Sequence, residues 1–338
     1  MAGLPAVARA VREVALAGFG AATVTVPGPW LDDPVVTAEV ARLAAGMPVA
    51  FATESAALQA AGTDSLLVSG ERLLDAEVLR LARSGARVDG TGTSGEESAL
   101  RDGGGTSALT EAGKRIIRET AKPGDGIVSR HLNRPVSQAI SRLLLHFDSI
   151  RPVHGSWGTA LIAVVMFACL LTGTDTGLMA GAALFQFASI FDGVDGEIAR
   201  ATFRTSPEGA RLDSLIDAVT NVACLGGVAL NLYMQGETMA ALAGVTGIVL
   251  LATGLTVIGR RARAHAAGLN FNAVKEHFSG QRSRLMTWLT WLTMRDFFAL
   301  FGAVLVIAGF AVHAMFAFAV IAAGWLVVVL SVMHRQPA

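Results

Sequence analysis

The chain has 338 residues, of which 52% are hydrophobic and 16% are charged, and its mean hydropathy is +0.52. A soluble domain carries roughly 25% charged residues, so this composition argues against a wholly soluble chain. The formal net charge of zero argues against a general nucleic-acid binder. The long apolar runs begin only after residue 155, and the preceding part has the composition of an ordinary soluble protein.

The first part of the chain alternates short apolar runs with helical patterns. Three strands and one helix are predicted there, over Ala21–Val26, Pro48–Ala52, Ser65–Val68 and Leu74–Ala82. Residues 85–113 are rich in Gly, Ser and Thr, which is typical of a flexible linker. We therefore expect a small cytoplasmic α/β domain with its linker over residues 1–113.

Residues 114–155 read as a segment that leads to the membrane. From Pro135 to Phe147 the apolar residues follow one helical face: Val136, Ile140, Leu143, Leu144 and Phe147. Arg134 and Arg142 add basic charge to the same segment. This pattern predicts an amphipathic helix on the membrane surface, and the alternative is an amphipathic helix packed within a soluble domain.

Six apolar segments follow, over Ser156–Thr172, Gly177–Phe191, Leu212–Met234, Thr238–Ile258, Phe297–Val312 and Ala314–Met333. A membrane-spanning helix needs about 20 residues, and the second segment is expected to continue through Asp192 toward Arg200. The predicted fold of residues 156–338 is therefore an all-α polytopic membrane domain with six transmembrane helices.

The connecting loops carry unequal charge. Residues 173–176, 235–237 and 313 contain no Lys or Arg. The segments on the other side carry Arg130, Arg134, Arg142, Arg151, Arg200, Arg204, Arg211, Arg260, Arg261, Arg263, Lys275, Arg282, Arg284, Arg295 and Arg335. Because positive residues stay on the cytoplasmic side, we expect a cytoplasmic-membrane protein whose termini and active site face the cytoplasm.

Four aspartates lie around the loop between the second and third apolar segments. Asp192 and Asp195 are three residues apart, and Asp213 and Asp217 are four residues apart. In helices, each pair shares one face, so neighbouring antiparallel helices would aim all four carboxylates at one another. The alternative is a purely structural role, in which the aspartates are solubilising charges at helix ends or partners of Arg200, Arg204 and Arg211.

Four carboxylates at a membrane boundary repel one another and are costly to desolvate. A hard divalent cation such as Mg²⁺ or Mn²⁺ removes this cost and can also hold phosphate oxygens. Gly196 and Gly209 leave room for a ligand, and Arg200 offers a planar fork to a phosphate. The pattern therefore favours a metal-dependent enzyme of phosphoryl chemistry.

This stretch resembles the signature of the CDP-alcohol phosphotransferase family, also called CDP-alcohol phosphatidyltransferases. The fixed positions of that signature are filled at the family's spacing by Asp192, Asp195, Gly196, Ala199, Arg200, Gly209, Asp213 and Asp217. The resemblance extends over roughly residues 130–335, where the six-helix pattern matches the family's membrane domain.

The resemblance implies a two-metal site held by Asp192, Asp195, Asp213 and Asp217. It also implies that Asp217 acts as general base on an acceptor hydroxyl, whose oxygen attacks the β-phosphorus of a CDP-alcohol so that CMP leaves. The CDP moiety would lie against Asp192, Gly196, Ala199, Arg200 and Gly209. A homodimer is a further expectation from the family.

The substrates are suggested by a second resemblance. Residues 122–134 are similar to the junction in bifunctional proteins that join an inositol-phosphate cytidylyltransferase to di-myo-inositol-phosphate phosphate synthase. The resemblance implies a sugar-like or inositol-phosphate ligand. The donor stays open between CDP-diacylglycerol and a soluble CDP-polyol such as CDP-inositol, and the acceptor is polar or lipid. Candidates for binding the acceptor phosphate are Arg204, Arg260, Arg261 and Arg263, which alternatively serve only to set the topology.

Two features depart from these relatives. The first membrane helix opens with Arg151-Pro152-Val153-His154, where many relatives have a Thr-Pro-Asn-like turn. Ser65–Asp75 resembles a nucleotidyltransferase core strand, but the Gly-rich nucleotide loop expected near the start is absent. We therefore expect the first domain to be a degenerate, non-catalytic nucleotidyltransferase-like unit.

The competing function class is a non-catalytic polytopic membrane protein, or a cation-coupled transporter that uses the aspartates as an ion site. It predicts cation flux without release of CMP. Transporters place such charges near the bilayer midplane, whereas these aspartates flank a predicted cytoplasmic loop. The enzyme is therefore the favoured interpretation.

Overall fold

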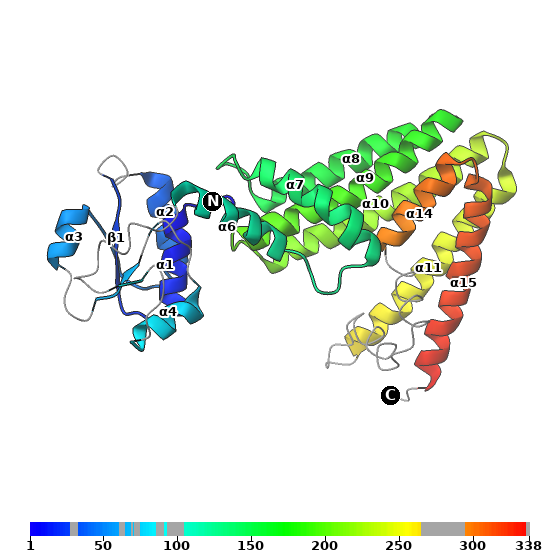
Figure 1. Cartoon of the computed structure of the whole chain (residues 1–338). Helices are drawn as coiled ribbons and strands as arrows, with labels where there is room; N and C mark the ends of the chain where they lie inside the picture. Colours follow the sequence, from blue (N-terminus) through cyan, green and yellow to red (C-terminus); the bar gives the residue numbers. More distant parts are fainter. Residues whose placement is uncertain are drawn as a thin grey trace. The chain divides into compact units, whose positions relative to one another are not determined.

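The computed structural model describes residues 1–27, 33–60, 65–68, 70, 75–85, 91–92, 105–264 and 295–335. The chain divides into two compact units (Figure 1). Unit 1 comprises Met1–Thr120 and Arg142–Ile150, and unit 2 comprises Ala121–Ser141 and Arg151–Ala338.

Unit 1 is a small α/β arrangement. Strands β1 (Ala22–Thr25) and β2 (Val49–Ala52) are parallel, with Ala22 opposite Val49, and helix α2 (Pro34–Leu43) lies between them in the chain. Parallel neighbours need such a crossover because a tight hairpin cannot join them. The remaining elements are α1 (Ala6–Leu16), α3 (Glu54–Ala60), β3 (Leu67–Val68), α4 (Ala76–Arg83), β4 (Thr91–Gly92) and α6 (Gly105–Glu119). The predicted strands overlap β1, β2 and β3, and the predicted helix is α4.

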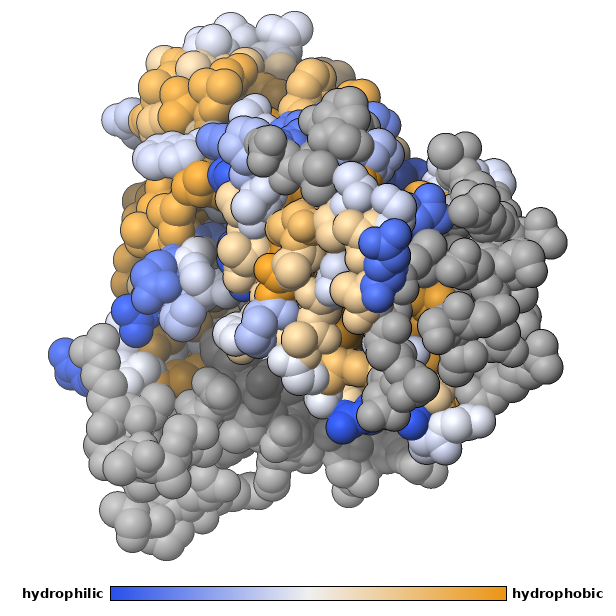
Figure 2. Space-filling model, turned by 90° about the vertical axis from the view of Figure 1, so that its left-hand side faces the viewer, coloured by the Kyte–Doolittle hydropathy of each residue, from blue (hydrophilic) through white to orange (hydrophobic). Residues whose placement is uncertain are grey.

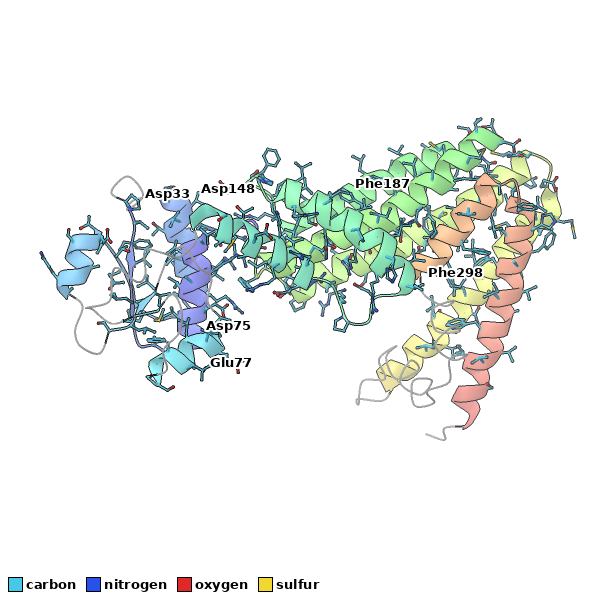
Figure 3. The ribbon with its side chains drawn as sticks, in the orientation of Figure 1. Asp33, Asp75, Glu77, Asp148, Phe187 and Phe298 are labelled. Carbon is cyan, nitrogen blue, oxygen red and sulfur yellow. The ribbon has the colours of Figure 1, made fainter. Side chains whose placement is uncertain are left out.

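Aspartate caps fix the starts of two of these helices (Figure 3). Asp33 accepts hydrogen bonds from the amides of Val35 and Val36 at 2.8 and 3.0 Å, and Asp75 accepts one from Val78 at 2.8 Å. Such caps satisfy amides that have no partner within the helix. Helix α6 begins at Gly105, so the C-terminal part of the predicted linker is helical.

Unit 2 consists of helices. Within the described residues, five are long and apolar enough to cross a membrane: α8 (Pro152–Leu170), α9 (Asp175–Ala201), α10 (Pro207–Met234), α11 (Thr238–Ala264) and α15 (Ala311–Arg335). Helix α9 continues through Asp192 to Ala201, as the sequence predicted.

The fifth predicted span corresponds to α14 (Arg295–Ile307), which has 13 residues. At 1.5 Å per residue this helix is about 20 Å long, less than the roughly 30 Å hydrocarbon core. The described part of the chain therefore contains five helices of spanning length and one shorter apolar helix.

The interior of unit 2 is a single apolar cluster shared by all six helices. It includes Met166 and Leu170 of α8, Leu178 of α9, Val228 of α10 and Met315 of α15. Apolar residues also remain exposed on the outside, among them Val164 and Val320, which are 66% and 72% exposed. Figure 2, which faces the left-hand side of Figure 1, shows apolar residues in orange beside polar residues in blue. Exposed apolar surface of this kind suits contact with lipid.

Helix α7 (Arg134–Leu144), which follows the short π-helix η2 (Ser129–Asn133), has its polar side inward. Asn133, Ser137 and Ser141 are buried, whereas Val136 and Leu143 are exposed. This distribution is the reverse of that of a helix on a water-soluble protein.

Candidate active site

The signature residues lie where α9 ends and α10 begins, and a tight turn joins the two helices. The amide of Arg204 donates to the carbonyl of Ala199 at 2.8 Å, and that of Phe203 donates to the carbonyl of Arg200 at 3.4 Å. Phe203 has a φ of 53°, so it adopts the left-handed conformation that usually falls to glycine in this helix-ending motif. The turn stops α9 at Ala201 and reverses the chain.

Helix α10 starts directly after this turn. Ser206 is its N-cap, and the side chain accepts a hydrogen bond from the amide of Gly209 at 3.0 Å, while Pro207 occupies the first turn. Serine at the cap and proline in the first turn are typical of a helix start. The position of Asp213 relative to the end of α9 is therefore fixed by local backbone geometry.

Asp195 is the buried member of the four aspartates, with 8% of its surface exposed. The hydroxyl of Ser156 on α8 donates to its Oδ2 at 2.6 Å. Gly155 permits this approach, because a Cβ at that position would lie 2.8 Å from the Cβ of Asp195. The start of α8 therefore packs directly against the Asp195 backbone.

One interaction between carboxylates joins the two helices at this point. Asp195 interacts with Asp192 on its own helix and with Asp213 on α10. Asp192, Asp213 and Asp217 are half-buried. Neighbouring carboxylates repel unless a proton or a cation lies between them, so this arrangement favours cation binding.

The donor set fits a hard divalent cation. Carboxylate oxygens are the ligands that Mg²⁺ and Mn²⁺ prefer, and the facing helices bring Asp195 and Asp213 together. Within the described residues, no three His, Cys, Asp or Glu side chains are grouped closely enough to hold a metal ion. The four-aspartate metal site predicted from the sequence therefore remains a prediction.

The residues expected around the nucleotide lie at the same end of the bundle. The guanidinium of Arg200 folds over Gly196, where a Cβ would lie 2.9 Å from Nη1. Ala199 is half-buried, and Gly209 is exposed in the first turn of α10. Gly196 and Arg200 are thus in contact, and their predicted role in binding the nucleotide phosphates stays a prediction.

The candidate acceptor arginines are only partly described. Arg204 is half-buried in the turn after α9, and Arg260 is exposed near the end of α11. The side chains of Arg261 and Arg263 lie outside the described residues. Their proposed contact with an acceptor phosphate stays a prediction.

Glu197 is a residue of this region that the sequence interpretation missed. Its side chain is completely buried and accepts hydrogen bonds from Ser137 and Ser141 at 2.6 Å each and from Arg134 at 2.9 Å. The available signal was its place between two signature residues, Gly196 and Ala199. An acidic residue in an apolar helix needs a partner, and the basic segment before the first membrane helix supplies one.

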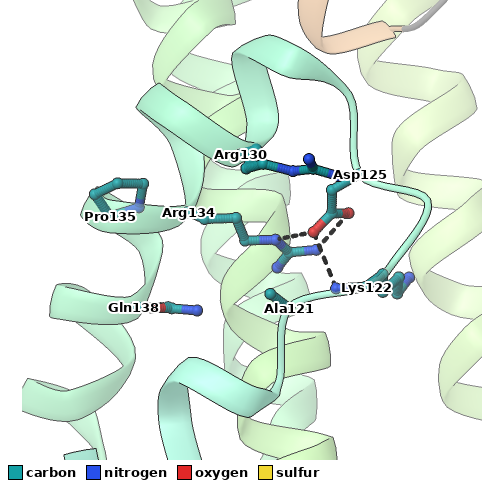
Figure 4. A pocket seen from close by; sticks show the side chains of 7 residues that line it. All are labelled: Ala121, Lys122, Asp125, Arg130, Arg134, Pro135 and Gln138. Carbon is teal, nitrogen blue, oxygen red and sulfur yellow. Dashed lines mark hydrogen bonds and ion pairs between the residues drawn. The ribbon is translucent and has the colours of Figure 1, made fainter. Parts of the chain in front are cut away.

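Arg134 also forms a two-pronged ion pair with Asp125, at 2.7 and 3.0 Å (Figure 4). Burial alone would raise the pKa of Asp125, but the hydrogen bonds and charge of Arg134 outweigh it and lower this pKa. Burial likewise opposes the charge on Arg134, yet Asp125 and Glu197 together raise its pKa. The same side chains border a cavity of about 160 Å³, lined by Ala121, Lys122, Asp125, Arg130, Arg134, Pro135 and Gln138.

The chain is similar in sequence to known bifunctional proteins. The chain is 34% identical over 139 residues to the bifunctional IPC transferase and DIPP synthase of Thermococcus kodakarensis, and 37% identical over 132 residues to that of Aquifex aeolicus. These matches cover 41% and 39% of this chain but only 28% and 29% of the relatives. The chain thus spans less than a third of these bifunctional proteins.

A third relative is the archaetidylinositol phosphate synthase of Methanothermobacter thermautotrophicus, 33% identical over 93 residues, which are 27% of this chain and 43% of the relative. The family model of the CDP-alcohol phosphatidyltransferases matches residues 158–333, more than half of the chain, and this range contains all four aspartates. With its apolar helices, the chain is an integral membrane protein. It belongs to the CDP-alcohol phosphatidyltransferase family.

Proposed function

We propose that this protein transfers a phosphoalcohol group from a CDP-alcohol to an acceptor hydroxyl and releases CMP. The observation that carries the proposal is the complete signature at a point where two helices face each other, with an electrostatic interaction between Asp195 and Asp213. The names of the relatives favour a role in inositol-phosphate or phospholipid headgroup synthesis.

Asp217 would take the proton from the acceptor hydroxyl as its oxygen bonds to the β-phosphorus. The bond from that phosphorus to the oxygen of CMP breaks, and CMP leaves with the electron pair. Arg200, folded over Gly196, would bind the nucleotide phosphates. A phosphate on the acceptor would be bound by the candidate arginines Arg204, Arg260, Arg261 and Arg263.

Asp192, Asp195, Asp213 and Asp217 would hold two divalent cations, Mg²⁺ or Mn²⁺. When bound, these ions supply neutralising charge to the phosphate oxygens. The chain's own contribution is to keep the carboxylates in place, and Ser156 does this for Asp195.

The membrane arrangement is part of the proposal. We place six spans, with α14 as the short one, α7 on the membrane surface, and both termini and the aspartates on the cytoplasmic side. The exposed apolar residues Val136 and Leu143 support the position of α7. The amide of Ser129 donates to Asp296 at 2.6 Å, so α14 starts at the same end of the bundle as η2. A homodimer is also proposed, and native mass spectrometry of the detergent-solubilised protein measures it.

The test is CMP release by the purified protein with Mg²⁺ or Mn²⁺. CDP-diacylglycerol and CDP-inositol are each paired with inositol, inositol phosphate and glycerol phosphate. We expect release that requires metal and one acceptor and falls about 10²- to 10⁴-fold in Asp217→Asn. Asp175→Asn, an exposed carboxylate at the other end of α9, is the matched control.

Metal-independent release, or full activity of Asp217→Asn, would contradict the proposed mechanism. Cation flux into liposomes without CMP release would instead support the transporter alternative. Product that partitions into the organic phase identifies a lipid donor, and product that stays in water identifies a soluble one.

A further inference from the structure

A second polar cluster lies against α9 on the side away from the signature aspartates. A separation of two residues turns a helix by roughly 200°, so Glu197 lies nearly opposite Asp195. Ser156 of α8 binds Asp195, and three donors from α7 bind Glu197. The segment that carries the signature is therefore held from two sides by different helices.

Both carboxylate oxygens of Glu197 accept hydrogen bonds from α7. Ser137 donates to Oε1 and Ser141 to Oε2, each at 2.6 Å, and Arg134 donates to Oε1 at 2.9 Å. Distances of 2.5–2.7 Å are typical of a hydroxyl that donates to a carboxylate. Bonds to both oxygens fix the rotation of the carboxylate as well as its place.

A glycine allows α7 to come this close. A Cβ at Gly193 would lie 3.2 Å from Nη1 of Arg134 and 3.3 Å from Oγ of Ser137, both tighter than ordinary contacts. Gly193 precedes Glu197 by one helical turn, on the same side of α9. A second polar contact, from the amide of Gln186 to Asn133 at 3.1 Å, fixes the other end of the same face.

Asp125 is the second carboxylate that binds Arg134. Asp125 accepts two hydrogen bonds from the guanidinium of Arg134 (Figure 4). The group that donates to Glu197 is therefore itself held in place by a residue that precedes α7. Arg134 and Asp125 are 11% and 12% exposed in their side chains. An apolar residue at position 197 would pack α9 against α7 but would not fix the orientation of α9 through hydrogen bonds.

We infer that Glu197 is a positioning residue, which sets the rotation of α9 about its axis so that Asp192 and Asp195 point toward α10. This inference rests on the proposed function for its consequence in catalysis. Its direct consequence is a property of the protein without substrates, the affinity of the aspartate face for a divalent cation. Groups that orient metal ligands from outside commonly change metal affinity or activity 10- to 100-fold when removed.

The experiment measures Mn²⁺ binding by the electron paramagnetic resonance signal of free Mn²⁺, with the full-length protein in detergent and no substrate. Glu197→Gln keeps the shape of the side chain and removes its charge. We expect its Mn²⁺ dissociation constant to rise about tenfold or more. Glu237→Gln, the same change at an exposed position, is the control and should bind as the unaltered protein does.

A second variant, Ser137→Ala with Ser141→Ala, removes two donors and leaves both charges of the Arg134–Glu197 pair in place. It should also weaken Mn²⁺ binding, and it carries the test if Glu197→Gln does not fold. Melting temperatures identify the folded variants. Folded variants with unchanged Mn²⁺ affinity would overturn the inference, because a purely structural role lowers stability alone.

CMP release measured on the same samples separates this inference from the proposed function. Weakened Mn²⁺ binding with no CMP release from any donor would support the positioning role and count against the reaction. Normal CMP release from the unaltered protein, with unchanged Mn²⁺ affinity in both variants, would count against the positioning role alone.

Discussion

The hydroxyl of Ser156 reaches the buried carboxylate of Asp195 from a different helix. A buried carboxylate that loses such a donor is destabilised by the uncompensated cost of its desolvation, and it is freer to rotate. Neither Ser156 nor Gly155 belongs to the signature, yet both define the place of one of its aspartates.

We expect Ser156→Ala to weaken Mn²⁺ binding about tenfold, because the carboxylate of Asp195 is then no longer oriented from outside. Titration of the purified protein with Mn²⁺ measures this. Ser214→Ala is the matched control, since that exposed hydroxyl donates to the carbonyl of Ala210 on its own helix. Equal affinities in the two variants would contradict the expectation.

Helical spacing predicted from the sequence that each pair of aspartates shares one helix face, and the family resemblance identified the other signature residues. Glu197 was not predicted, because its three donors lie 56 to 63 residues earlier in the chain. Local periodicity records which face of a helix is polar, but not which distant side chain will meet it. Contacts of this kind are visible only in three dimensions.

The start of α10 is an element whose stability depends on one side chain. Ser206→Ala removes the cap on Gly209 and should destabilise the protein by about 1 kcal/mol. Ser206→Asp keeps an acceptor and places a negative charge at a helix N-terminus, so it should retain the stability. Thermal unfolding in detergent compares the two, and equal losses would show that the cap is unimportant.

The ion pair between Asp125, which precedes η2, and Arg134 at the start of α7 gives this element pH-dependent stability. Arg134 lowers the pKa of Asp125, so this pair stabilises the folded chain above the ordinary carboxyl value of about 3.9. That contribution is lost as the pH falls through the lowered pKa. Thermal unfolding between pH 6 and pH 3 should therefore show a steeper acid loss in the unaltered protein than in Asp125→Asn. Parallel curves would contradict this, and Asp175→Asn is the control.

The sequence predicted the secondary structure of unit 2 well, because long apolar runs leave helix as the stable form in a membrane. Its errors have physical causes. Gly103, Gly104 and Gly105 suggested a linker, yet α6 starts at the last of them, since the residues that follow are good helix formers. The apolar pattern of α7 predicted the helix, but only the structure shows that its polar face packs against Glu197.

At the scale of the whole molecule, the number of spans determines where the chain ends. Six spans return the C-terminus to the side of the N-terminus, whereas five leave it on the opposite side. We expect the first outcome, because α14 starts beside η2 through the bond of Asp296 to Ser129.

Membrane-impermeant thiol labelling of sealed vesicles measures this. Glu54→Cys, Glu208→Cys and Gln336→Cys should react from one side, and Glu237→Cys from the other, with Cys169 and Cys224 replaced. Reaction of Gln336→Cys together with Glu237→Cys would contradict six spans. Reaction of Glu208→Cys together with Glu237→Cys would show that α10 does not cross.

The turn at Phe203 has a consequence for the length of the chain between the two halves of the signature. Two backbone hydrogen bonds and the Ser206 cap fix the conformation of the short connection between α9 and α10. One residue inserted into the first turns of α10, ahead of Asp213, would turn Asp213 and Asp217 by about 100° relative to α9 and shift them by about 1.5 Å. The number of residues from Asp195 to Asp213 therefore sets the orientation of one aspartate pair relative to the other. Single insertions there should abolish cation binding even though every ligand is still present.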